Sequence, residues 1–224
     1  MRKGDEKRRE LLNVAEALFC RLGYEKTSVQ DILDATDLSK GGFYHHFASK
    51  EEVLNALCER RAEQAAVSTA EMLSQAESPM ARINAVLRGF VPLRRDAAEF
   101  AAMLLPVMDK KEGRAIALVY QEALERQFQP LLKAEIAMAA AVEAVFPPVK
   151  EMESAILSLV NHCWMSIAAE ACAALREGRN IEPAALLGMM TKYRRAVELL
   201  LDAPYGTIEI IRVEELDAVL RNLG

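Results

Sequence analysis

The sequence contains few of the residues on which several common classes of protein depend. Of its 224 residues, four are cysteine, three are histidine, one is tryptophan, and 6% are aromatic. Cys20, Cys58, Cys163 and Cys172 form no Cys-x-x-Cys pair and lack the spacing of a zinc site. We therefore expect buried, reduced thiols, with no bound metal and no cofactor.

Long apolar runs and catalytic motifs are missing as well. No stretch of about 18 apolar residues is present, and the chain opens with charged residues rather than an apolar signal region. The sequence has no nucleophile elbow and no phosphate-binding glycine loop, and its carboxylates are scattered. These absences favour a cytoplasmic protein that has no contact with a membrane and is not an enzyme.

The chain also lacks the excess of basic residues that is typical of nonspecific nucleic-acid binders. Its formal net charge is −5, and residues 1–60 hold ten basic against eleven acidic side chains. Any contact with DNA must therefore be local. The first ten residues hold five basic side chains against three acidic ones, which suits either an arm that meets phosphates or a solvated, frayed terminus.

Strong helix formers, by contrast, are abundant. Ala, Leu, Glu, Met and Arg recur throughout with few β-branched runs, which predicts an all-α fold of one large or two unequal domains. Within residues 11–22, six apolar residues follow the spacing of one buried helix face: Leu11, Leu12, Ala15, Leu18, Phe19 and Leu22. Gly23 provides a stop for this helix.

Capping patterns predict the next three helices. Thr27 and Gln30 fit a capping box that opens a short helix, and Ser39 can cap a third helix whose two phenylalanines share one face. Residues 49–52 form a second capping box, which opens a helix near residues 51–75 that joins two domains. Four helices thus fit in about 60 residues.

Prolines and glycines divide the rest of the chain into about five more helices. Breaks are expected at Ser78-Pro79, Pro92, Pro106, Gly113, Pro147-Pro148, Gly178, Pro183 and Pro204. The longest predicted helices cover residues 113–144, 150–177 and 183–202. Residues 207–213 alternate like a strand, although no partner strand is evident, and residues 214–223 predict a last helical segment. In total, we expect about nine to ten helices.

The segment from Thr27 to Lys50, TSVQDILDATDLSKGGFYHHFASK, resembles the DNA-binding segment of the tetracycline-repressor (TetR) family of bacterial regulators. The likeness lies in the order of a capping threonine, a short helix, a Ser-Lys-Gly turn, a Tyr-x-His-Phe helix and a Ser-Lys-Glu helix opening. A short helix, a tight turn and a compact helix with a polar face also form the geometry that enters a major groove. We therefore expect a helix-turn-helix DNA-binding domain in residues 1–50.

The candidate DNA-binding residues lie on the second and third helices and at their ends. They are Thr27, Ser28, Gln30, Lys40, Gly41, Gly42, Tyr44, His45, His46 and Lys50. The resemblance implies phosphate contacts for Tyr44 and His46. Lys40 and Lys50 suit phosphate clamps, and Thr27 suits a hydroxyl or amide contact.

Direct reading of bases is less clearly encoded. The family often has Thr, Ser or Ala where this chain has Gly42, so no side chain can reach a base from there. Readout would then rest on His45, Lys40, and Gln30 or Ser28, although Gln30 can equally be used by the capping box. Gly41 and Gly42 suit either close approach to DNA or crowding against the second helix, and the two histidines can also be plain surface residues.

Residues 51–224 are expected to form a helical ligand-binding and dimerisation domain, since the resemblance implies a homodimer on double-stranded operator DNA. The surplus apolar surface of the last two long helices predicts the dimer interface, with Ile156, Leu159, Val160, Ile167, Leu186, Met190, Val197 and Leu201. An apolar or amphipathic small-molecule effector would contact Met103, Met108, Tyr120, Phe128, His162, Trp164 and Met165, most of which also suit plain core positions.

These features together predict a DNA-binding transcriptional regulator, in the first place a repressor that a small-molecule effector releases from its operator. Two alternatives stay open. One is an activator of the same family. The other is a helical ligand-binding protein that has lost DNA binding, which Gly42 and the acidic first 60 residues would suit.

Overall fold

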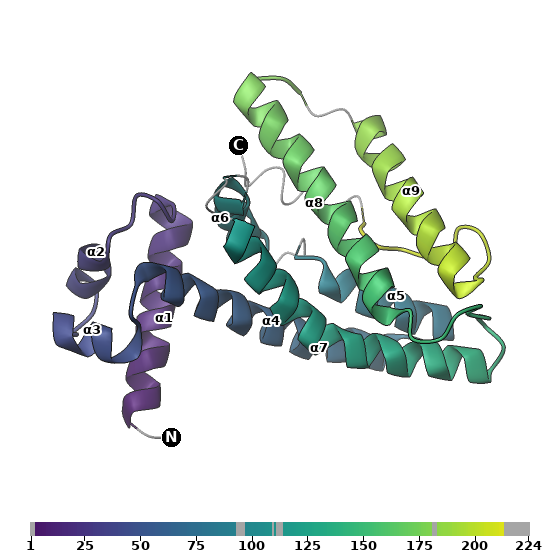
Figure 1. Cartoon of the computed structure of the whole chain (residues 1–224), viewed down its shortest axis with the longest axis horizontal. Coiled ribbons are helices and arrows are strands. Elements are labelled where there is room, and N and C mark those ends of the chain that lie inside the picture. Colours follow the sequence, from purple (N-terminus) through teal and green to yellow (C-terminus); the bar gives the residue numbers. More distant parts are fainter. Residues whose placement is uncertain (1–2, 93–96, 109, 111–113, 181–182, 213–224) are drawn as a thin grey trace.

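The fold was examined in a computed structural model, which describes residues 3–92, 97–108, 110, 114–180 and 183–212. Within these ranges the chain forms nine α-helices and no strand, as expected for an all-α protein (Figure 1). The helices are α1 (Lys3–Leu22), α2 (Val29–Asp34), α3 (Lys40–His46), α4 (Lys50–Gln75), α5 (Pro79–Phe90), α6 (Ala98–Met108), α7 (Arg114–Ala141), α8 (Glu153–Glu177) and α9 (Pro183–Leu201). The predicted helical segment 214–223 lies outside the described residues.

Serine side chains begin four of these helices. Ser28, Ser39, Ser49 and Ser78 each accept a hydrogen bond from a free backbone N–H in the first turn of the helix that follows. The capping box predicted for Thr27 and Gln30 is wrong by one residue. Ser28 is the N-cap, and the Asp31 carboxylate accepts the return bond from the Ser28 N–H at 2.7 Å. Because Asp31 already fills this role, Gln30 is left free of it.

The expected breaks hold at most prolines and fail at one. Pro79 and Pro183 begin helices, where the missing N–H has no intrahelical partner to lose. Pro106 lies inside α6, two residues before its end, where it removes the hydrogen bond to the Ala102 carbonyl without ending the helix at that point. Gly178 ends α8 with a φ of +64°, a left-handed conformation that favours glycine.

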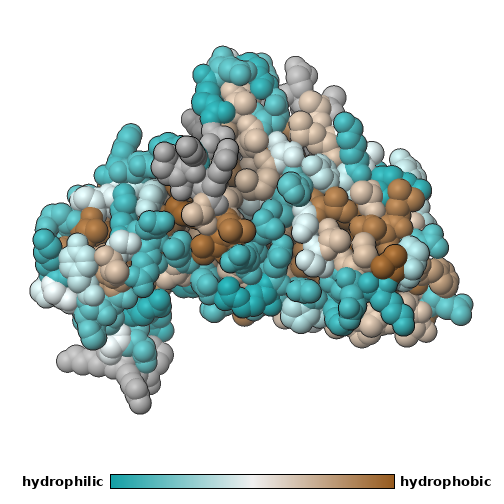
Figure 2. Space-filling view, in the orientation of Figure 1, coloured by the Kyte–Doolittle hydropathy of each residue, from teal (hydrophilic) through white to brown (hydrophobic). Residues whose placement is uncertain are grey.

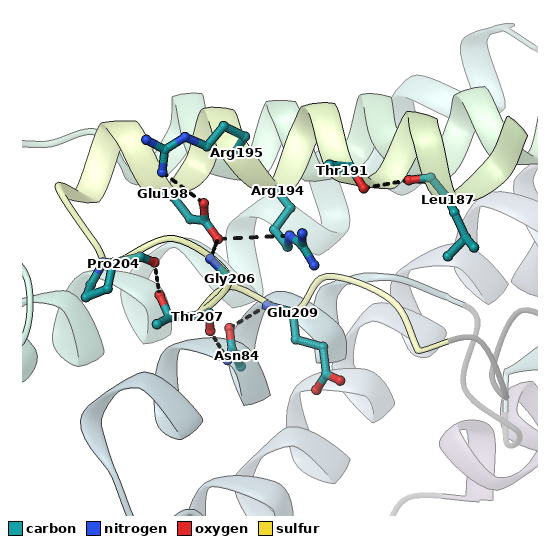
Figure 3. Close-up of polar contacts among 10 residues, drawn as sticks. All are labelled: Asn84, Leu187, Thr191, Arg194, Arg195, Glu198, Pro204, Gly206, Thr207 and Glu209. Carbon is teal, nitrogen blue, oxygen red and sulfur yellow. Dashed lines mark hydrogen bonds and ion pairs between the residues drawn. The ribbon is translucent and has the colours of Figure 1, made fainter. Parts of the chain in front are cut away.

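The strand predicted for residues 207–213 is not formed in the described part, which ends at Arg212. Residues 202–212, here called the C-terminal strap, run in an extended path beside α9 (Figure 3). The side-chain amide of Asn84 bonds to the Thr207 carbonyl at 2.8 Å and accepts from the Glu209 N–H at 2.9 Å. The Asn84 side chain therefore makes the hydrogen bonds to these two backbone groups that a neighbouring strand would otherwise make.

The helix α4 connects the two ends of the molecule, as expected. It begins beside α1, α2 and α3 and continues into the larger group formed by α5 to α9, where it packs against α5 and α7 (Figure 1). Two arginines of α4, Arg60 and Arg61, form ion pairs with Glu16 of α1. These contacts fix α1 and the start of α4 as one unit.

One helix of the described residues is long and apolar enough to cross a membrane by length and composition alone. This is the stretch Glu153–Ala174 of α8, of which 56% is buried inside the molecule. A core helix of a folded domain has the same composition, because it is covered on most sides by other helices. Helix α8 packs in this way against α5, α6, α7 and α9.

Candidate nucleic-acid interface

Helices α1, α2 and α3 share a small apolar core that fixes the orientation of α3. Phe43 and Phe47 are fully buried against apolar residues of α1 and α4, so the face of α3 that carries them points inward, as the sequence predicted. Arg8 of α1 lies over the Phe47 ring at 4.7 Å, which closes this core from the side. The opposite face of α3 is consequently fixed toward solvent.

The outward face of α3 is polar and open. Tyr44 is 49% exposed, Lys40, Gly41 and His45 are exposed, and His46 is half-buried. The His45 and His46 rings lie 5.2 Å apart, centroid to centroid, near the end of the helix. This face offers a phenolic hydroxyl, an ammonium and imidazole nitrogens, all suited to phosphate oxygens and base edges.

Lys50 is bonded inside the domain, and its role as a phosphate clamp stays a prediction. Its Nζ donates to the carbonyls of Tyr24 and Thr27 at 2.8 and 2.9 Å, and it lies 4.2 Å from the Tyr24 ring centroid. Partial burial lowers the pKa of the Lys50 ammonium, although nearby Glu25 opposes this effect. Two of its three N–H donors therefore hold the segment before α2, and one remains for another partner.

Thr27 cannot present its hydroxyl to DNA as predicted. The side chain is buried, and its Oγ1 donates to the carbonyl of Gly23 at 2.9 Å. The reason is the one-residue shift of the cap, since Ser28 takes the exposed cap position and Thr27 turns inward to the end of α1.

The remaining candidates are Gln30 and Ser28 at the start of α2 and the glycine pair of α3. Gln30 is exposed and donates to Asp34 at 2.6 Å, whereas Ser28 is exposed and bonded to Asp31. A Cβ at Gly42 would meet Leu38 and Ser39 at 3.4 and 3.5 Å and nothing from α2. Crowding against the second helix is therefore not the reason for the glycine pair.

Most of the residues predicted to line an effector pocket are packed in the core of the described part of the chain. Met103, Met108, Tyr120, Phe128 and Trp164 are buried in the core, and Met165 is half-buried. His162 is exposed, so it is not a polar group among apolar neighbours.

A buried polar residue of α8 is its neighbour, Asn161. Its amide donates to Gln121 at 3.0 Å and accepts from the Trp164 indole N–H at 2.9 Å. The spacing of Asn161 and Trp164, three apart on one helix face, is a signal that could have identified this pair.

A cleft of about 850 Å³ lies between α1, the segment that follows it, and α6. Met103 is the one predicted effector residue in its wall. Apolar groups such as Phe19, Leu22 and Val107 line it together with charged ones, and an ion pair between Lys110 and Glu25 at 3.3 Å connects its two sides. No local pattern in the sequence could identify this cleft, because its walls come from segments about 80 residues apart.

Most residues predicted for the dimer interface are used inside the chain instead. Ile156, Val160, Ile167, Leu186, Val197 and Leu201 are all buried in the core, while Leu159 and Met190 are half-buried. The surplus apolar surface is absorbed by the packing of α8 and α9 against each other and of α8 against α5, α6 and α7. A dimer through these helices must therefore use their other faces.

The four cysteines are free thiols, with Cys58 and Cys163 buried and Cys20 and Cys172 half-buried. Burial raises the pKa of Cys20 to about 11 and those of Cys58 and Cys163 to about 12. These thiols accordingly stay protonated near neutral pH and are poor nucleophiles. Among the described residues, no group of three or more His, Cys, Asp or Glu side chains could hold a metal ion.

Comparison with known proteins matches the region just described. Residues 11–57 match the family described as bacterial regulatory proteins, tetR family. The HTH-type transcriptional repressor KstR2 of Mycobacterium tuberculosis is 45% identical over 53 residues, which cover 24% of this chain and 26% of that protein. The match therefore spans about a quarter of this curated relative.

Solved structures extend the likeness in fold to nearly the whole chain. A protein of Mesorhizobium loti described as a TetR-family transcriptional regulator has a TM-score of 0.59 at 16% identity, covering 89% of this chain and 98% of that one. GusR of Salmonella enterica has a TM-score of 0.54 at 17% identity, covering 91% and 99%. Both share the arrangement of helices with this chain, and residues 11–57, which hold the helix-turn-helix, are similar to the tetR family of bacterial regulatory proteins.

Proposed function

We propose that this chain is a dimeric transcriptional regulator, with a DNA-binding domain in residues 1–50 and a sensing and dimerisation domain in residues 51–224. The observation that carries the proposal is the outward polar face of α3, held at one end of the molecule by the buried Phe43 and Phe47. A helix fixed in this way on a helix-turn-helix frame can enter a major groove without rearrangement. The name of the relative KstR2, a transcriptional repressor, favours repression.

On this proposal the exposed residues of α3 supply the contacts. Tyr44 and Lys40 would bond phosphates, which positions the helix, and His45 would reach base edges. Ser28 and Gln30, exposed at the start of α2, would bond the neighbouring backbone. Lys50 contributes mainly by holding the segment before α2.

The dimer would form through the faces of α8 and α9 that the core leaves open. On α8 these positions are Ala155, Leu159, His162, Ala169 and Ala173, and on α9 they are Ala185, Gly188, Lys192, Ala196 and Leu199. Small side chains let two helix pairs approach closely, and Leu199, 60% exposed, supplies apolar area. Two copies are needed because one short reading helix makes too few contacts to select an operator.

The effector, an apolar or amphipathic small molecule, would act by changing the relation between the two domains. The cleft between α1 and α6 supports this part of the proposal, because a molecule bound there touches the DNA-binding unit and the sensing domain at once. Binding that tilts α4 would change the separation of the two reading helices and release DNA.

The test begins with selection of binding sites from a pool of random duplexes, using the full chain. We expect enriched sequences with two half-sites related by a two-fold axis. Tyr44→Phe should then weaken binding to the selected duplex and to unrelated duplexes alike. His45→Ala should lower the affinity for the selected duplex by about tenfold. It should also reduce the difference in affinity between this duplex and duplexes changed at one base position.

Glu63→Gln, on an exposed part of α4, is the matched control and should bind like the parent chain. If no sequence is enriched, or if His45→Ala and Tyr44→Phe bind DNA as well as the control does, the proposed reading helix is wrong.

A further inference from the structure

The groove between α9 and the C-terminal strap has the features of a second ligand site, separate from the cleft beside α1. Its volume is about 610 Å³, within the range of small-molecule sites. Leu187, Met190 and Arg194 line it from α9, and Ile208 and Ile211 line it from the strap. The walls therefore combine apolar side chains with polar ones, among them the Arg194 guanidinium at the side of α9.

Arg194 has hydrogen-bonding capacity that its surroundings do not use. Its Nε is buried and donates no hydrogen bond to any described residue. The nearest carboxylate oxygen, Oε1 of Glu198, is 3.9 Å from this nitrogen, which is too far for a hydrogen bond. A buried donor without a partner costs free energy, and this cost is recovered when an acceptor arrives.

Glu198 pairs with Arg194 only at long range, because each of its oxygens is held closer to another donor. The carboxylate is fully buried, Oε1 accepts from the Gly206 N–H at 2.7 Å, and Oε2 accepts from Arg195 at 3.1 Å. Figure 3 shows Glu198 between Arg195 and the strap, whereas Leu187 and Arg194 point from α9 toward the groove. Glu198 thus fastens the strap, and Arg194 is left facing the groove.

The charge and shape of the groove define the ligand class. Arg194 and Arg212 are positive and Glu209 is negative, so the lining carries one net positive charge, and Glu209 is already paired with Arg212 at 3.0 Å. A single carboxylate matches the Arg194 guanidinium, whose ion pair with Glu198 is long at 3.9 Å, and a short hydrocarbon chain matches Leu187 and Met190.

From this arrangement we propose that the groove binds an amphipathic monocarboxylate, with its carboxylate on Arg194 and its hydrocarbon chain along Leu187 and Met190. The site does not depend on the proposed DNA binding, since it lies in the strap and α9 alone. It can therefore be tested with the free protein.

The test is calorimetric titration of the full chain with octanoate and with octan-1-ol, which have the same chain length and differ in charge. Octanoate is expected to bind at one site per chain and about tenfold or more tighter than octan-1-ol. Arg194→Gln should remove this difference while leaving the binding of octan-1-ol unchanged.

Arg195→Gln is the matched control. It changes the neighbouring arginine, which also pairs with Glu198 but does not line the groove, and it should bind octanoate like the parent chain. Thr191→Phe, which fills the groove from α9, should block both probes. Circular dichroism checks that each variant is folded.

Three results would overturn the proposal. They are no binding of octanoate by the folded parent chain, equal binding of octanoate and octan-1-ol, or equal loss of octanoate binding in the Arg194 and Arg195 variants.

Discussion

At the scale of single residues, Lys50 stabilises the helix-turn-helix domain from inside and need not touch DNA to do so. Its ammonium joins the first turn of α4 to the carbonyls of Tyr24 and Thr27, and so fixes the segment that delivers α2. A charged donor bonded to two backbone carbonyls contributes more than a surface ion pair does. Its effect on DNA binding should follow from its effect on stability.

Replacing Lys50 with methionine should lower the stability of the free protein. We expect a loss of about 1–2 kcal/mol in the free energy of unfolding, since two charge-assisted hydrogen bonds are removed at a partly exposed site. Urea denaturation followed by circular dichroism, without DNA, measures this. A pure phosphate clamp would leave stability in the absence of DNA unchanged.

Lys40→Ala provides the contrast, because Lys40 is exposed at the start of α3. It should leave stability nearly unchanged and make the dependence of log affinity on log salt shallower by about 0.9 per protomer. If the two variants behaved alike in both measurements, the different roles assigned to these lysines would be wrong.

The residues of the reading helix could be predicted from sequence because spacing alone decides which side of a short helix is buried. Phe43 and Phe47 turn inward, and this leaves Tyr44 and His45 outside. The roles of Thr27 and Lys50 could not be predicted. They depend on a shift of one residue in a cap and on a contact between residues 23 positions apart, which no local pattern encodes.

At the level of helices, Gly89 allows α5 to cross α4 at close range, beside Thr69. A Cβ at Gly89 would lie 1.9 Å from the Thr69 hydroxyl and 3.0 Å from the Thr69 Cβ. Thr69 is fully buried, and its hydroxyl donates to the Ala65 carbonyl at 2.7 Å. Neither helix can relieve an added methyl group without moving.

Gly89→Ala should therefore destabilise the protein by about 1–3 kcal/mol, although alanine favours helices more than glycine does. Thermal unfolding of Gly89→Ala, Thr69→Ala and the double variant checks this as a double-mutant cycle. The glycine substitution should cost less in the Thr69→Ala background, because the nearest atom is then removed. Equal costs in both backgrounds would mean that the helices do not meet as described.

Helix boundaries could be predicted from serine caps and glycine stops. Which helices pack against one another could not be predicted in this way. Apolar residues of α8 and α9 were predicted to face a second subunit, yet most of them face the core. Periodicity identifies a buried face but does not say which element covers it. The strap shows the same limit, since its alternating pattern is satisfied by Asn84 rather than by a strand.

On the scale of the whole molecule, apolar surface is concentrated away from the DNA-binding end. Figure 2 shows most of the hydrophobic colour on the half formed by α5 to α9, while the end formed by α1 to α3 is mostly hydrophilic. Exposed side chains such as Phe146, Val149, Leu199 and Tyr205 belong to that half. This distribution suits association through the larger domain and leaves the other end free.

Ala169→Arg should separate the dimer, because it places a long cation in the middle of the open face of α8. Light scattering coupled to size exclusion would then give the mass of one chain, 24.9 kDa, in place of twice that value. Ala134→Arg, on an exposed position of α7, is the control and should leave the dimer intact. A monomeric parent chain, or an unchanged dimer in Ala169→Arg, would refute the assignment of this face.

The length of the uninterrupted helix α4 also determines how far a small tilt displaces its end. Its 26 residues extend for about 39 Å at the rise of an α-helix. If the helix stays fixed at the crossing of Thr69 and Gly89, about 29 Å separate this point from Lys50, and a tilt of about 7° displaces the Lys50 end by about 3.5 Å, close to the spacing of neighbouring base pairs. On the proposed function, a change in the sensing domain no larger than a side-chain rearrangement would then shift the DNA-binding end by one base pair along the operator.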